Sequence, residues 1–174
     1  SESETLEKEL KELKEEADKL IEDIRRRLEE VARRVERNVT ESERTLEELL
    51  RRAREKKKRR PQDREVEKEL TEYRKELEKN REKSERDIRR VKEKLDEIED
   101  RLRERLKRVK DRLDKVDVDR RVKEEVKRVL EEIERALRTV LKEVRDLLKR
   151  LEELHREVLD KNRRVLKAIS DEAK

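Results

Sequence analysis

The stretch LLRRAREKKKRRPQDREVEKEL, residues 49–70, holds the only proline of the chain. Proline disfavours a helical conformation for the residue before it, and a following aspartate can cap the next helix. The segment Arg60-Pro61-Gln62-Asp63 therefore predicts the connection between two helices. On both sides of it, apolar residues recur every three or four positions, which is the spacing of one face of an α-helix.

Three stripes with this spacing follow one another along the chain. The first consists of Leu6, Leu10, Leu13, Ala17, Leu20, Ile24, Leu28, Val31, Val35, Asn38, Ser42, Thr45, Leu49 and Ala53. The second runs from Val66 to Leu113. The third consists of Val122, Val126, Val129, Ile133, Leu137, Val140, Val144, Leu147, Leu151, His155, Val158, Asn162, Val165 and Ile169. The intervening Val116-Asp117-Val118-Asp119 weakens the helix and offers a capping aspartate, so we predict a second connection there.

The numbering of the stripes predicts how the helices pack. Two antiparallel helices place residues at one level when their numbers add up to a constant, which is 122 for the first and second stripes and 235 for the second and third. We therefore predict an all-α fold, a single-chain, antiparallel, up-down-up three-helix bundle of long, nearly straight helices. It forms one domain, residues 1–174, with helices over residues 3–60, 63–115 and 119–172.

The composition excludes several kinds of site. Of the 174 residues 61% are charged, 56 basic and 51 acidic, and glycine and cysteine are absent. Without cysteine there is no disulfide or thiolate metal site, and without glycine there is no phosphate-binding loop. No apolar run approaches the roughly 18 residues of a membrane span. We expect a soluble chain with no targeting signal, cofactor, metal ion or membrane partner.

All three asparagines, the only tyrosine and the only histidine fall at core positions of the stripes, together with two serines and a threonine. The set consists of Asn38, Ser42, Thr45, Tyr73, Asn80, Ser84, His155 and Asn162. The two constants place Ser42 with Asn80 and His155 at one level, and Asn38 with Ser84 at the next. A buried polar group without a partner costs about 1 to 3 kcal/mol, so a matched set penalises every register that separates its members. We interpret the set as a buried hydrogen-bond network that selects one register.

Two other interpretations of these residues remain open. Ser42, His155 and Asn80 are the residue types of a nucleophile, a base and an orienting amide. Because no glycine-rich turn supplies an oxyanion hole, we expect no enzyme activity and no catalytic residue. Alternatively, His155 is a pH switch, since a protonated imidazole in the core would lack a charged partner.

The basic segment RRAREKKKRR, residues 51–60, resembles a nucleic-acid-binding patch. Cations also stabilise the carboxyl end of a helix, and no aromatic residue stands nearby to stack on a base. We interpret the segment as a solvated helix end and expect no nucleic-acid partner.

Further apolar residues flank the first and third stripes. They are Ile21, Ala32, Val39, Leu46 and Leu50 in the first, and Leu130, Leu137, Leu141, Leu148, Leu159 and Leu166 in the third. We expect them to fill the seam between the two parallel helices of a monomer. The alternative is a surface that docks a second copy or a designed helical partner.

Taken together, these features resemble those of computationally designed, parametrically generated helical bundles with buried hydrogen-bond networks. The resemblance rests on the glycine-free charged helices, the Pro61-Gln62-Asp63 connector, the stripe spacing and the polar residues at matched core levels. It implies a stable scaffold with no evolved substrate, which requires no partner and resides in the cytoplasm of a recombinant host. It also leaves open an interaction module, such as one component of a designed oligomer or switch.

Overall fold

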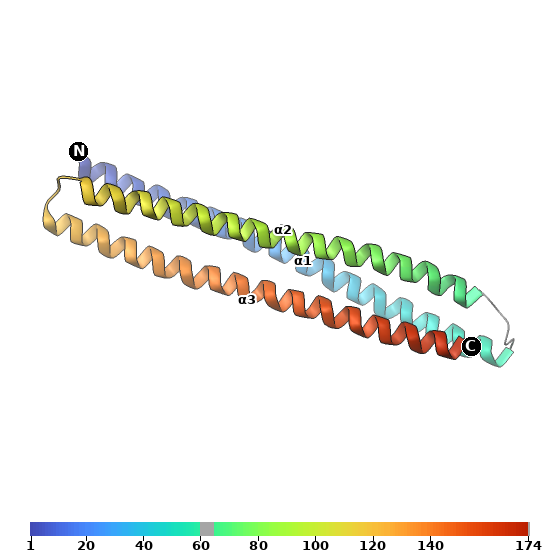
Figure 1. The fold of residues 1–174 in the computed structure, drawn as a ribbon. Coiled ribbons are helices and arrows are strands. Elements are labelled where there is room, and N and C mark those ends of the chain that lie inside the picture. Colours follow the sequence, from blue (N-terminus) through green and yellow to red (C-terminus); the bar gives the residue numbers. More distant parts are fainter. Residues whose placement is uncertain (60–64, 174) are drawn as a thin grey trace. The chain divides into compact units, whose positions relative to one another are not determined.

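The structure is a computed structural model that describes the backbone of residues 1–59 and 65–173 and the side chains of residues 1–55 and 67–172. Three helices follow one another, α1 (Glu2–Arg59), α2 (Glu65–Lys115) and α3 (Arg120–Ala173), and Figure 1 shows their order. The described residues contain no strand. The all-α prediction is confirmed. The predicted connection at residues 60–63 lies outside the described residues.

The helix ends follow from local chemistry. The Ser1 hydroxyl accepts a hydrogen bond from the backbone N–H of Glu4 at 3.3 Å, as a capping residue does. Residues 116–119 connect α2 to α3, as predicted, and the carbonyl of Asp119 accepts the N–H of Lys123 at 3.0 Å. Charged pairs one turn apart support the helices in between, for example Glu104 with Arg108 at 2.9 Å.

The chain divides into two compact units, each of which contains a segment of every helix. The first unit comprises Ser1–Leu28 and Arg90–Leu148, and the second comprises Glu29–Arg89 and Lys149–Lys174. The prediction of a single domain stays a prediction.

In the first unit, α1 and α2 run in opposite directions. The pairs Glu2 with Asp117, Glu9 with Arg112 and Glu16 with Arg105 show this, because the α2 number falls as the α1 number rises. Helices α2 and α3 are antiparallel as well. The α3 number rises as the α2 number falls in the pairs Lys110 with Glu134 and Asp96 with Arg145. The core of this unit contains fully buried side chains from all three helices: Leu6, Leu13, Ile24, Leu95, Ile98, Leu102, Leu130 and Val144.

The second unit has the same helix directions. Asn38 bonds to Ser84, and further along α1 Arg52 pairs with Glu69 earlier in α2, so α1 and α2 are antiparallel with numbers that add up to 122 or 121. This agrees with the predicted constant to within one residue. At one end of the unit an apolar cluster joins the three helices: Leu46, Leu49, Ala53, Leu70, Tyr73, Leu166 and Ile169.

The buried face of α3 differs from the predicted stripe. Val129 and Leu147, both predicted core residues, are 37% and 48% exposed, whereas their neighbours Leu130 and Leu148 are 1% and 3% exposed. The helix is rotated so that the flanking leucines face inward. The physical reason is that α3 carries two adjacent apolar columns, and the column with more leucine buries more apolar area.

The same one-residue shift occurs at two places in α1. Leu20 is only half-buried while Ile21 is buried, and Thr45 is half-buried while Leu46 is buried. At the second place the side chain without a hydroxyl, Leu46, occupies the interior. Leu20 and Ile21 have nearly the same apolar area, so this preference does not explain the first. The expected burial of the flanking residues is therefore met at Ile21 and Leu46.

Candidate functional site

The predicted polar residues gather in the second unit. A small cavity of about 30 Å³ is lined there by polar side chains from α1, α2 and α3. The polar lining residues that the sequence predicted are Asn38, Ser42, Asn80, Ser84, His155 and Asn162. These six residues are called the polar cluster below. The cavity is large enough for about one water molecule.

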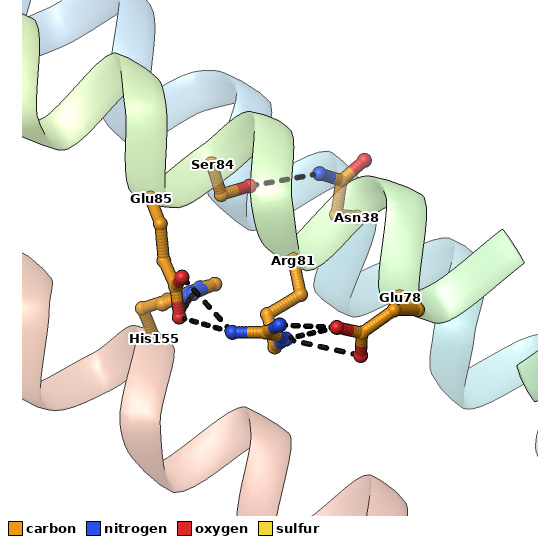
Figure 2. A network of polar contacts seen from close by, with 6 residues as sticks. All are labelled: Asn38, Glu78, Arg81, Ser84, Glu85 and His155. Carbon is orange, nitrogen blue, oxygen red and sulfur yellow. Dashed lines mark hydrogen bonds and ion pairs between the residues drawn. The ribbon is translucent and has the colours of Figure 1, made fainter. Parts of the chain in front are cut away.

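One direct hydrogen bond joins two helices within the polar cluster. The Nδ2 group of Asn38 donates to the Oγ atom of Ser84 at 3.5 Å, as Figure 2 shows. Ser84 is buried and Asn38 is half-buried. The distance is at the long limit for this kind of bond, so its contribution to stability is at the low end of the usual range of about 0.5 to 1.5 kcal/mol.

The remaining two predicted residues, Tyr73 and Thr45, do not line this cavity. The Tyr73 hydroxyl donates to the backbone carbonyl of Ser42 at 3.3 Å, and burial raises the pKa of this phenol. Thr45 donates to the carbonyl of Glu41 in its own helix at 2.9 Å. Its hydroxyl is satisfied locally, as is common for threonine inside helices, and makes no inter-helical bond.

His155 lies at the edge of the polar cluster with a carboxylate beside it. Its side chain is 13% exposed, and its Nε2 atom lies 3.9 Å from Oε1 of Glu85, which is too long for a hydrogen bond but close enough for an ion pair. Burial lowers the pKa of His155 below its ordinary value of 6.5, with Glu85 opposing the shift and Arg81 adding to it. The expectation that a protonated His155 would lack a partner is therefore wrong, because Glu85 supplies one.

A series of charged side chains on α2 extends the polar cluster to the surface. Arg81 donates to the Glu78 carboxylate through Nε at 3.0 Å and to the Glu85 carboxylate through a terminal nitrogen at 2.9 Å. Figure 2 shows the resulting series Glu78, Arg81, Glu85 and His155. The hydrogen bond from Arg81 lowers the pKa of Glu78, and its two carboxylate partners raise the pKa of Arg81.

Sequence reasoning missed these charged residues. Their spacing of three and four residues on a helix is the available signal, but the same spacing occurs in many exposed pairs elsewhere, such as Glu22 with Arg26. What distinguishes Arg81 is its position beside Asn80 and Ser84, and only the rotation of α2 about its axis shows that it lines the same cavity as His155.

The arrangement lacks the contacts of a catalytic triad. Asn80 makes no hydrogen bond to any described residue, and the buried Nε2 atom of His155 has no hydrogen-bond partner among them. A triad requires a base held by its orienting group and bonded to the nucleophile. Among the described residues, no group of three or more histidines, cysteines and carboxylates is placed to hold a metal ion.

Comparisons with known proteins bear on the fold. The chain matches no protein-family model and no curated protein sequence. It is similar to a solved structure described as "Computationally designed three helix bundle", with a TM-score of 0.55 and 20% sequence identity over 99% of this chain and 76% of the other. The chain is a three-helix bundle.

In this bundle the two predicted parallel neighbours, α1 and α3, are linked in each unit by a surface pair. Arg25 lies 3.8 Å from Glu143 in the first unit, and Lys161 lies 3.2 Å from Glu43 in the second. Such exposed pairs contribute about 0 to 1 kcal/mol each.

None of the helices in the described part has an apolar stretch of the length that a bilayer crossing requires.

Proposed function

We propose that the bundle is a designed structural scaffold without a natural biochemical activity, whose fold is specified by an apolar core together with the polar cluster. The observation that carries this proposal is the 30 Å³ cavity, around which polar residues from all three helices meet. The likeness to a designed bundle and the absence of glycine support it. We expect a monomer that needs no cofactor or partner.

The polar cluster contributes little to the stability of the native fold, but it strongly destabilises folds in which a helix is slipped or rotated. It contains one long hydrogen bond, while Asn80 and Asn162 make none to any described residue. A slipped or rotated helix would bury these amides against apolar side chains, at about 1 to 3 kcal/mol for each group. Apolar residues at these positions would stabilise the native state, but they would fit other registers equally well.

An apolar-cluster variant tests this proposal. It combines Asn38→Leu, Asn80→Leu, Asn162→Leu and Ser84→Ala, and we expect its denaturant midpoint to rise above that of the parent. We also expect broadened amide NMR resonances or a mixture of masses in light scattering, because alternative registers become accessible. The variant Thr45→Val is the control, since its hydroxyl bonds only to Glu41. An apolar-cluster variant that stays a uniquely folded monomer would contradict the proposal.

The absence of enzyme activity has its own test. The parent and the variant His155→Ala are compared for hydrolysis of an activated ester such as nitrophenyl acetate. Because Asn80 does not bond to any described residue and so orients no base, we expect both to match the slow rate of a free imidazole or less. A rate in the parent far above this level that disappears in the variant would reject the scaffold proposal.

An interaction module is the second candidate function. In the first unit, Val129, Ala136 and Leu147 are exposed on one face of α3, and Ile133 and Val140 on that face are half-buried. Exposed apolar strips of this kind serve as docking surfaces for other helices. Light scattering separates the two functions, since a mass near 21.5 kDa favours the scaffold and a multiple of it favours the module.

A further inference from the structure

A larger groove lies beside the polar cluster in the second unit. It has a volume of about 430 Å³ and runs between α2, residues 74–81, and α3, residues 159–171. On each helix the lining residues recur every three or four positions, so they form the two walls of one groove. Its volume is within the range of about 300 to 1,000 Å³ that small-molecule sites occupy.

The floor of the groove is apolar. Leu77 from α2 and Leu159 and Leu166 from α3 line it, and Leu166 is buried while the other two are half-buried. The half-buried leucines leave apolar surface in contact with solvent. An apolar group placed on this surface would be stabilised in proportion to the apolar area that it removes from water.

A buried amide faces the same groove. Asn162 is only 6% exposed, lines both the groove and the small polar cavity, and makes no hydrogen bond to any described residue. Its donor and acceptor groups are therefore available to a bound molecule. The amide therefore stands where the groove meets the polar cavity, within reach of a molecule that lies in the groove.

The charges at the rim favour an anion. Four cations line the groove, Arg74, Arg81, Arg163 and Lys167, against the two carboxylates of Glu78 and Asp171. Arg81 is already bound to the carboxylates of Glu78 and Glu85. Arg74 and Lys167 form no ion pair with any described residue. A rim with an excess of unpaired cations attracts and orients an anionic head group.

We propose that this groove binds an amphipathic organic anion, a carboxylate or sulfonate with an apolar body. The body lies on Leu77, Leu159 and Leu166, and the head group accepts hydrogen bonds from the Asn162 amide and the cations Arg163 and Lys167. Neutral or cationic molecules with the same body bind more weakly, since they gain nothing from these donors.

The test uses anilinonaphthalene sulfonate, whose fluorescence rises in an apolar site, with the full folded chain at low ionic strength. We expect saturable binding, and displacement by dodecanoate at a lower concentration than by dodecyltrimethylammonium. In the double variant Arg163→Gln/Lys167→Gln the dissociation constant should rise about five-fold, which is typical for the loss of two exposed ionic contacts. In Asn162→Leu, which keeps the number and the branching of the side-chain heavy atoms, a similar rise of about five-fold is expected from the lost hydrogen bond.

The matched control is Arg156→Gln/Arg164→Gln. It removes two exposed cations of the same helix that do not line the groove, so the net charge changes equally. We expect its dissociation constant to stay within about two-fold of the parent. Equal weakening in the two double variants would show binding to net charge alone and overturn the proposal. No saturable binding by the parent, or displacement by the cationic detergent at the same or a lower concentration than by dodecanoate, would overturn it as well. Far-UV circular dichroism of each variant confirms that the dye reports on the folded state.

Discussion

His155 is the residue of the polar cluster that links the stability of the second unit to pH. Burial lowers its pKa in the folded chain below 6.5, so the unfolded chain binds the proton more tightly. Its contribution to stability is therefore complete above about pH 6.5 and decreases as the pH falls towards the folded pKa, below which it is constant. We expect acidification from about pH 7 to about pH 4.5 to lower the denaturant midpoint more in the parent than in His155→Leu.

Glu85 limits this acid effect, because its carboxylate lies 3.9 Å from Nε2 of His155 and opposes the lowering of the pKa. In the variant Glu85→Gln the imidazole keeps its burial and the repulsion by Arg81, which both lower its pKa, but loses the attractive charge of Glu85. Its pKa should fall further, and the loss of stability in acid should be larger than in the parent. Equal acid losses in the parent, Glu85→Gln and His155→Leu would show that His155 has no part in the pH dependence.

For single residues, the sequence predicted which polar side chains gather better than it predicted which hydrogen bonds they form. The placement of every asparagine, the histidine and the tyrosine in core register is visible in the spacing, and the structure brings six of the eight predicted polar residues around one cavity. Which atoms bond depends on side-chain length and on rotations of a fraction of a turn. For this reason Tyr73, which the constant of 122 places at the level of Leu49, reaches the carbonyl of Ser42, and Thr45 turns back to its own helix.

Each helix buries one face. In α3 the buried face can be tested most directly, because adjacent apolar residues differ in exposure. Leu130 is 1% exposed in the core of the first unit, while its neighbour Val129 is 37% exposed. We expect Leu130→Ala to lower the free energy of unfolding by about 2 to 5 kcal/mol, because it leaves a cavity. The adjacent change Val129→Ala should cost less than about 1 kcal/mol.

Denaturant titration of the two variants measures this difference, and Lys127→Ala, an exposed neighbour, reports the effect of the substitution itself. A larger loss for Val129→Ala than for Leu130→Ala would restore the stripe that the sequence predicted. The connection between α2 and α3 did not present this difficulty, because a capping residue such as Asp119 marks the start of α3 locally. Rotation of a helix with two adjacent apolar columns depends on its neighbours, which local spacing does not contain.

For the whole molecule, the question is whether the two compact units unfold together. Every helix contributes a segment to both units, with no break in α1, α2 or α3 where one unit gives way to the other. When a segment of a helix unfolds in one unit, the segment of the same helix in the other unit gains a new end with unpaired backbone groups. Unfolding of one unit therefore destabilises the other. We therefore predict one cooperative transition, as for a single domain.

The single tyrosine makes this prediction measurable. Tyr73 lies in the second unit, so its fluorescence follows that unit, whereas far-UV circular dichroism follows all three helices. The variant Leu95→Ala creates a cavity at a fully buried position of the first unit and should shift both signals to the same lower denaturant midpoint. Lys107→Ala, at an exposed position of α2 in the same unit, should leave both in place. If Leu95→Ala moves the circular dichroism transition and not the Tyr73 signal, the units unfold separately and the chain has two domains.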